Sequence, residues 1–304
     1  MTKHSHHSHG IPENSTTRRL WITMALNLII TVAEIIGGLV SHSLSLISDA
    51  LHNFSDGIAV LLTFIALKLK KYEFSDRHTF GLKRAEIFAA VINSSFLLGI
   101  SIFLFYESAR RLLSPSPVGG RMMAVVAAIG LGANVAGTLL LKKISSQSLN
   151  IRSAYFHLFT DALSSLAVVL GGIAIIKWQI FWIDPILTIL ISIYILRKSI
   201  QILSEAIHIL MEGAPPDISR KDIEQEVEAL EEVEDIHHIH LWMVGDGDIH
   251  LEAHVNVQDM AISESDLLRK RIERMLVKKF GINHITLQFE CKQCLEEQIS
   301  GKRC

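Results

Sequence analysis

Six long apolar segments are the feature that most constrains how this chain can fold. They cover residues 20–40, 44–67, 85–109, 122–141, 154–176 and 181–203. Each has the roughly 20 residues that an α-helix needs to cross the hydrocarbon core of a bilayer. The chain is also 49% hydrophobic, which is typical of a membrane protein with a soluble part. We therefore predict an all-α membrane domain with six transmembrane helices over residues 18–210.

The basic residues of the connecting loops predict the orientation of these spans. Thirteen Lys and Arg residues would lie on one side of the membrane and four on the other. Because cytoplasmic loops carry the excess of Lys and Arg, both termini are expected in the cytoplasm. The first apolar segment is long enough to remain as a span, so no cleaved signal peptide is expected.

Two of the apolar segments contain the same pattern, His-x-x-x-Asp. It occurs at His52 and Asp56 in the second segment and at His157 and Asp161 in the fifth. Residues four apart lie on one face of a helix, so each pair could share one ligand. Ionisable side chains are costly inside a bilayer, and four at matched spacing indicate a functional site. Two imidazoles and two carboxylates suit tetrahedral Zn²⁺, whereas all-oxygen sets suit Mn²⁺ or Mg²⁺.

Other polar side chains lie inside the predicted spans. Asp49 lies seven residues before Asp56, near the same helical face, and could be a second-sphere or entry carboxylate. For the remaining polar residues, an interhelical hydrogen bond is the expected role. They are Asn27, Glu34, Asn93, Asn134 and Asp184.

The apolar pattern stops near Leu210, and an acidic region follows. Residues 205–304 hold 11 Lys and Arg against 21 Asp and Glu, whereas residues 1–204 hold 18 against 10. We predict a helix from Ser219 to about Glu232, strands over 236–244 and 249–257, a helix over 263–280 and a strand over 283–290. In the helix predicted over 263–280, the residues expected to face inward are Leu267, Leu268, Ile272, Leu276 and Val277. Residues 211–291 are thus expected to form a cytosolic α+β domain of order αββαβ.

These features together resemble the cation diffusion facilitator family, and within it the bacterial zinc, cobalt and cadmium efflux members. The resemblance covers about residues 18–290 and includes the loop stretch Arg-His-Thr-Phe-Gly (77–81) and the segment His-His-Ile-His-Leu-Trp (237–242). It implies a homodimer in the inner membrane that exports divalent cations in exchange for protons. It also implies a metallochaperone-like, ferredoxin-like tail. The first ligand, His52, points to zinc, while Co²⁺, Cd²⁺ and Ni²⁺ stay open as cargo.

The resemblance also implies a zinc site in the tail, where zinc would be a structural or regulatory ion. The ligands map to His237, His254 and Glu290. His254 and Glu290 lie on the polar faces of their strands. By strand alternation, however, His237 falls on the same face as the apolar residues Ile239 and Leu241. It is therefore expected at the start of its strand, before the sheet begins, and His240 is the alternative ligand.

Two further implications of the resemblance concern residues near the membrane. A loop metal site falls near Asp76 and His78, although a loop His is more often simply solvated. Arg84 and Glu212 match a basic and an acidic position of the family. We predict an ion pair between them, with two separately solvated charges as the alternative.

The chain ends contain additional Cys and His residues. All three cysteines lie in the last fourteen residues, which favours a reduced cytosolic tail over a disulfide framework. Cys291 and Cys294 form a CxxC pair, a candidate second cytosolic site where the domain 211–291 meets the tail 292–304. The arm 1–17, expected to be disordered, has four His residues that either are solvated or gather metal: His4, His6, His7 and His9.

The expected function is Zn²⁺/H⁺ antiport by alternating access. His52 and His157 are candidate proton carriers because imidazole titrates near neutral pH. Two alternatives are a membrane zinc sensor without flux and an intramembrane metalloenzyme. The sequence has no HExxH motif or nucleophile elbow, and it has no P-loop for a nucleotide. Neither enzymatic activity nor a nucleotide or nucleic-acid partner is expected.

Overall fold

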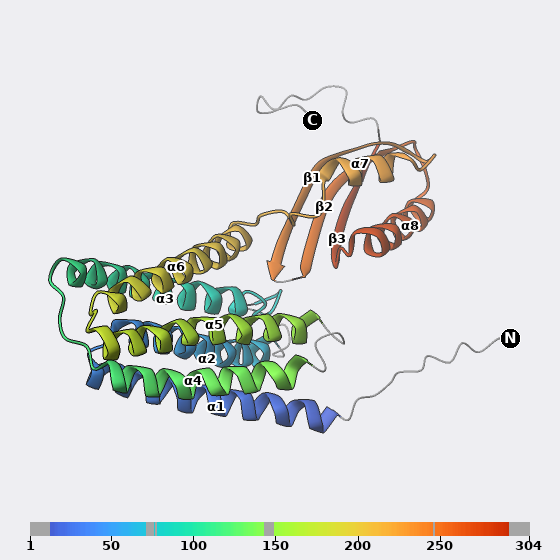
Figure 1. The fold of residues 1–304 in the computed structure, drawn as a ribbon. Helices are drawn as coiled ribbons and strands as arrows, with labels where there is room; N and C mark the ends of the chain where they lie inside the picture. Colours follow the sequence, from blue (N-terminus) through green and yellow to red (C-terminus); the bar gives the residue numbers. More distant parts are fainter. Residues whose placement is uncertain (1–12, 71–75, 77, 143–148, 246, 292–304) are drawn as a thin grey trace. The chain divides into compact units, whose positions relative to one another are not determined.

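The structure, a computed structural model, describes residues 13–70, 76, 78–142, 149–245 and 247–291 (Figure 1). The chain divides into two compact units. One consists of Met1–Leu62 with Ile92–Gln201, and the other of Thr63–Val91 with Ile202–Cys304.

The six predicted spans correspond to six long helices. They are α1 (Glu13–Ser41), α2 (Leu44–Lys70), α3 (Ala85–Leu113), α4 (Gly120–Lys142), α5 (Leu149–Trp178) and α6 (Ile183–Leu210). In the described residues, four helical stretches are long and apolar enough to cross a membrane: Ala85–Leu113, Gly120–Leu139, Tyr155–Trp178 and Ile183–Leu210. A shorter apolar stretch, Asn27–Ser41, belongs to α1. The prediction of a membrane domain built from helices is confirmed.

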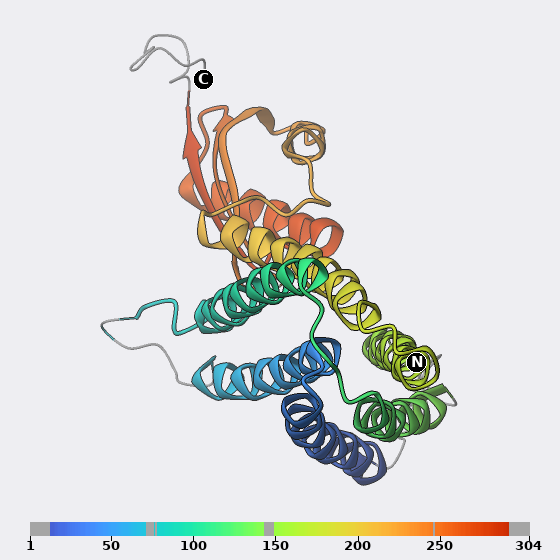
Figure 2. The same ribbon diagram turned by 60° about the vertical axis from the view of Figure 1, so that its left-hand side comes forward.

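Helices α4 and α5 lie side by side in both views of the fold (Figures 1 and 2). Their close approach depends on small residues, because a Cβ atom added at Gly172 would lie 2.9 Å from the backbone nitrogen of Ala124. Small residues at helix contacts are typical of membrane bundles, where van der Waals packing drives association. Around this contact lies a buried apolar cluster: Leu46, Val118, Met123, Val126, Ala127, Val168 and Ile175.

A carboxylate from α6 caps the start of α2. Asp184 accepts hydrogen bonds from the backbone nitrogens of Leu44 (2.8 Å) and Ser45 (3.1 Å). It also accepts bonds from the hydroxyl groups of Ser43 and Ser45, both at 2.6 Å. The first N–H groups of a helix have no partner within the helix, and an N-cap normally comes from the preceding residue. Here a residue 140 positions away supplies the acceptor.

The second unit contains the predicted αββαβ domain. Its elements are α7 (Arg220–Glu228), β1 (Val233–Gly245), β2 (Asp248–Val257), α8 (Ile262–Phe280) and β3 (His284–Glu290). Strand order is β1-β2-β3, with β1 and β2 antiparallel and β2 and β3 parallel. Ser219 caps α7 by accepting a bond from the nitrogen of Lys221. The predicted end of this helix at Glu232 is wrong, because the chain turns after Ala229 and β1 begins at Val233.

The core of this domain lies between α7, α8 and one face of the sheet. Its members include Ile223, Val227, Leu251, Ala253, Val255, Leu268, Ile272 and Leu276. The inward orientation predicted for Leu267 and Val277 is wrong, since they are 68% and 52% exposed. Each is adjacent in sequence to a buried residue, and successive side chains project about 100° apart around a helix, so here only one of the two faces the core.

Truncating one core side chain is expected to destabilise the protein measurably. Ile272→Ala removes a fully buried side chain and leaves a cavity, which should lower the free energy of unfolding by about 2–5 kcal/mol. The matched control on the same helix is Leu267→Ala, which should change it by less than about 0.5 kcal/mol. Thermal unfolding of the purified full chain measures both, and equal midpoints for the two variants would contradict the assigned core.

Two ion pairs join loop residues to the domain within the second unit. Lys83 Nζ lies 2.6 Å from Asp248 Oδ2, and Arg84 Nη2 lies 3.2 Å from Glu212 Oε1. The second pair is the one predicted from the sequence. Both of its members are substantially exposed, so it should contribute only about 0–1 kcal/mol to stability.

His250 is buried beside this loop, among aromatic rings. Ring centroids of Phe80, Trp242 and His284 lie 5.5, 5.4 and 4.7 Å from its own. Burial lowers the pKa of His250, and the Asp248 carboxylate opposes this effect only in part. The folded protein therefore takes up a proton here less readily than the unfolded chain does.

This pKa shift predicts a loss of stability in mild acid. The folded state keeps its full stability above the unfolded pKa of about 6.5, where His250 is neutral in both states. As the pH falls below that value, the unfolded chain binds a proton on His250 that the folded protein does not bind, and stability is lost. Unfolding midpoints at about pH 7.5 and 5.5 should differ less in His250→Leu than in wild type, since leucine cannot titrate. The same difference in both proteins would show that His250 is not responsible.

Candidate metal centres

Helices α2 and α5 bring the two His-x-x-x-Asp pairs together. His157 Nε2 lies 3.0 Å from Asp56 Oδ2 and 3.5 Å from Asp161 Oδ2. His52 Nε2 lies 3.5 Å from Asp56 Oδ2 and 3.8 Å from Asp161 Oδ1. The two imidazole centroids are 5.9 Å apart and nearly perpendicular. Each carboxylate therefore contacts both imidazoles, one on its own helix and one on the facing helix.

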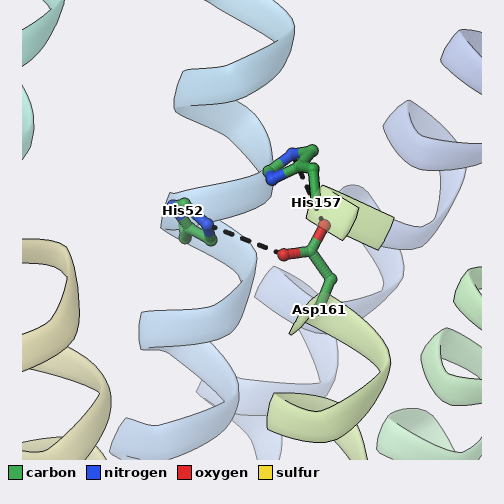
Figure 3. Close-up of side chains that lie close together, drawn as sticks. All are labelled: His52, His157 and Asp161. Atoms are coloured by element: carbon green, nitrogen blue, oxygen red, sulfur yellow. Dashed lines mark ion pairs between the residues drawn. The ribbon is translucent and has the colours of Figure 1, made fainter. Parts of the chain in front are cut away.

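Three of these residues could hold one metal ion directly. His52, His157 and Asp161 each offer a ligand atom, and these atoms all lie within 4.8 Å of one another (Figure 3). His52 and Asp161 are buried, and neither ring nitrogen of His52 has a hydrogen-bond partner in the described part of the chain. Buried polar atoms are normally paired, so an unpaired imidazole facing two carboxylates is suited to binding a cation.

A network of hydrogen bonds surrounds this cluster. Asp49 accepts bonds from the hydroxyl groups of Ser164 (2.5 Å) and Ser165 (3.1 Å) on α5, and Glu34 accepts one from the Asn53 amide (3.1 Å). The interhelical bonds predicted for Glu34, Asn93, Asn134 and Asp184 are all formed.

One neighbour of this cluster was not predicted from the sequence. The ring of Tyr194 on α6 lies edge-on to His52, with centroids 6.3 Å apart. No spacing rule relates this residue to the second or fifth segment, so the sequence offered no signal for it.

The second cluster lies on the polar face of the sheet in the αββαβ domain. His237 Nε2 lies 3.3 Å from Glu290 Oε2, and His254 Nδ1 lies 2.9 Å from Glu290 Oε1. These three residues form the other group able to hold a metal among the described residues. The Nδ1 atom of His237 also contacts Asp235 Oδ1 at 2.7 Å. Such a carboxylate fixes the orientation of an imidazole that serves as a metal ligand.

The predicted position of His237 at the start of its strand is wrong. β1 begins four residues earlier, at Val233, and His237 pairs directly with His254 on β2. The register shifts between His237 and His240, where His238 has a φ of +49°. This irregularity changes the alternation of the strand and turns His237 toward the polar face. His240 lies opposite Glu252 instead and is not part of the cluster.

The remaining predicted ligands lie outside both clusters. Asp76 and His78 are exposed and belong to neither group of metal-binding side chains found in the described ranges. Cys291 is exposed with a free thiol. Cys294 and the four His residues of the arm 1–17 lie outside the described residues.

Two family models match the chain in succession. The cation efflux transmembrane domain matches residues 20–211, and the cytoplasmic domain of cation efflux proteins matches residues 215–292.

Several transporters are similar to this chain over nearly their whole length. The metal cation efflux system protein CzcD of Cupriavidus metallidurans is 34% identical over 95% of this chain and 90% of its own length. A cadmium, cobalt and zinc/H(+)-K(+) antiporter of Bacillus velezensis is 37% identical over 93% of this chain and 91% of its own. The zinc transporter ZitB of Escherichia coli is 33% identical over 98% and 97%.

A solved structure is similar to a shorter part of the chain. It is the metal-bound C-terminal domain of the CzcD transporter, at 30% sequence identity. The match covers 24% of this chain and 99% of that domain, with a TM-score of 0.22.

Proposed function

The chain belongs to the cation efflux family, and we propose that it exports Zn²⁺ from the cytoplasm in exchange for protons. Family membership makes it an efflux transporter of divalent metal cations and not an enzyme. The intramembrane metalloenzyme considered from the sequence is thereby excluded. Zinc as the cargo, protons as the counter-ion and alternating access are the parts that we propose.

Zinc as the cargo is supported chiefly by the donor set on α2 and α5. Two imidazole nitrogens, each 3.0–3.8 Å from an oxygen of both carboxylates, match the borderline-soft character of Zn²⁺. Mn²⁺ and Mg²⁺ prefer sets made only of oxygen. The printed names of the relatives, which include zinc transporters and a cadmium, cobalt and zinc antiporter, agree with zinc and leave room for neighbouring metals.

Protons as the counter-ion are supported by the chemistry of the two histidine ligands. An imidazole binds metal only through an unprotonated nitrogen, so zinc and protons compete for His52 and His157. If the helices expose the site to each side in turn, zinc is released where proton activity is high. We further propose that the protein is a homodimer in the inner membrane with both termini in the cytoplasm. In this proposal the membrane domain is residues 18–210 and the cytosolic domain is residues 211–291. Zinc bound by His237, His254 and Glu290, the tail cluster, is proposed to be a regulatory ion.

Metal uptake into proteoliposomes with an imposed pH gradient tests the main proposal. Zn²⁺, Cd²⁺, Co²⁺ and Mn²⁺ would be compared in wild type and Asp56→Ala. Zinc accumulation that requires both the gradient and Asp56 is the expected result. Zinc binding without accumulation in wild type would overturn the proposed flux and favour a zinc sensor.

The tail cluster predicts an effect of zinc on the rate of transport. Two acidic tails repel each other, and zinc held by His237, His254 and Glu290 would reduce this repulsion and couple cytosolic zinc to transport. His254→Ala should therefore remove about one bound zinc per chain and flatten the rise of flux with cytosolic zinc. The matched control is His284→Ala, an exposed histidine on the neighbouring strand. Unchanged zinc stoichiometry in His254→Ala would contradict the assignment.

A further inference from the structure

Glu34 on α1 is the most deeply buried carboxylate near the α2–α5 cluster, which consists of His52, Asp56, His157 and Asp161. Its side chain is 0% exposed. Oxygen Oε2 accepts a hydrogen bond from the Asn53 amide at 3.1 Å, and Asn53 follows His52 directly in the sequence. Oxygen Oε1 has no hydrogen-bond partner among the described residues. Glu34 is thus connected to the helix that carries two of the proposed zinc ligands, and it keeps one oxygen free.

Asp49 on α2 is a second buried carboxylate next to Glu34. It is 2% exposed and lies four residues before Asn53, on the same helical face. Its partners are the hydroxyl groups of Ser164 and Ser165, and Asn134 donates in turn to Ser165. These donors satisfy hydrogen bonds but carry no charge. Within the described residues, neither Glu34 nor Asp49 forms an ion pair with Lys, Arg or His.

Asp49 is offset from the zinc cluster along the helices, whereas Glu34 reaches the level of His52 because its partner Asn53 is the next residue. Asp49 lies three residues before His52 and seven before Asp56 on α2, and its partner Ser164 lies three residues after Asp161 on α5. At 1.5 Å per residue, the offsets are about 5–10 Å on α2 and about 5 Å on α5. Since α2 and α5 enter the cluster from opposite chain directions, both offsets point to the same end of the helices. In the proposed orientation this is the non-cytoplasmic end.

Glu34 has one neutral donor and Asp49 has two, too few to offset a charge buried in a bilayer, so these carboxylates need a proton or a cation. The available donors are oxygen atoms and amide groups, a poor set for zinc compared with the two imidazoles nearby. A proton requires no coordination geometry and fits on a single oxygen such as Oε1 of Glu34. The observations therefore favour a proton over a second zinc ion.

A glycine on α4, Gly130, makes room for the Oε1 atom of Glu34. A Cβ atom added at Gly130 would overlap Oε1 of Glu34. Any other residue at this position would push the carboxyl group away from α4. The free oxygen thus sits against a backbone with no side chain, a contact that can be altered without changing any titratable group.

We propose, on the basis of the antiport put forward above, that Glu34 binds one of the protons exchanged for zinc, at a site separate from the zinc ligands. After zinc has left, the Oε1–H bond forms with a proton from non-cytoplasmic water. When zinc enters from the cytoplasm, that bond breaks and the proton passes to cytoplasmic water. Zinc and this proton exclude each other because Zn²⁺ bound at the ligands repels the proton on Glu34 electrostatically. The charged groups acting on Glu34 are Asp49 on α2 and Asp161 on α5.

The test compares wild type with Glu34→Gln in proteoliposomes that report zinc and internal pH together. Glutamine keeps the shape and one acceptor oxygen but cannot bind the proton. Zinc–zinc exchange at equal pH should stay within about twofold of wild type, while protons moved per zinc and the stimulation by a pH gradient should fall at least about fivefold. The matched control, Glu107→Gln, changes a glutamate paired with Arg110 and Arg111 and should couple like wild type.

Gly130→Ala provides an independent variant if Glu34→Gln does not fold. It leaves every titratable group in place but displaces Oε1, so the pH dependence of coupled flux should shift while zinc–zinc exchange persists. Wild-type coupling in both variants would overturn the proton site and leave antiport intact. Loss of zinc binding together with coupling in Glu34→Gln would also overturn it, in favour of a ligand role. Absence of zinc-driven proton movement in wild type would overturn antiport itself, and the proton site with it.

Discussion

Asp161→Ala is expected to abolish zinc transport in a protein that still folds and dimerises. Asp161 contacts both imidazoles of the α2–α5 cluster, at 3.8 Å from His52 and 3.5 Å from His157. Removing it leaves a site with only one carboxylate to offset the charge of the ion inside the bilayer. Loss of groups that merely orient a metal ligand already lowers affinity or activity roughly 10- to 100-fold, so loss of a ligand should lower zinc flux by at least about 100-fold.

Zinc uptake into proteoliposomes measures this effect, and size-exclusion chromatography verifies the fold and dimer. Asp259→Ala removes an exposed carboxylate after β2 and is the matched control, with wild-type flux expected. Flux within a few-fold of wild type in Asp161→Ala would exclude the α2–α5 cluster as the transport site. The tail cluster would then be the main metal site of the protein.

Asp184→Ala is expected to cause a large loss of stability in the membrane helices. Four donors at the start of α2 lose their acceptor, and the cap is fully buried. A buried donor left without a partner costs about 1–3 kcal/mol. With partial relaxation, we expect a loss of about 3 kcal/mol, which corresponds to a fall of roughly 5 °C in the unfolding midpoint of a chain of 304 residues.

Thermal unfolding of the detergent-solubilised protein checks this prediction. Asp184→Asn keeps one acceptor oxygen and should lose less stability than the alanine variant. Because α2 carries His52 and Asp56, zinc affinity should also weaken in Asp184→Ala, although Asp184 contacts neither ligand in the described structure. An unchanged midpoint would show that α2 is held in place by apolar packing alone.

The sequence by itself determined the elements with strong local signals. Six apolar segments of bilayer length predicted α1 to α6, because a helix is the structure that satisfies its own backbone in lipid. The spacing of four between His and Asp placed His52 with Asp56, and His157 with Asp161, each pair on one face of its helix. In the tail, alternation in β2 and β3 predicted the face that bears His254 and Glu290. These inferences hold because they depend on helix and strand periodicity, which is set within a few residues.

Only the tertiary structure decided features that join distant residues or depart from regular geometry. His237 faces Glu290 because the backbone at His238 breaks the strand alternation, which a parity rule cannot anticipate. Leu267 and Val277 are exposed because the domain core reaches only one side of α8. Asp184 caps a helix that begins 140 residues earlier, and Glu34 joins the metal cluster through Asn53. Such pairings depend on which helices pack together, and no local pattern in the sequence contains that information.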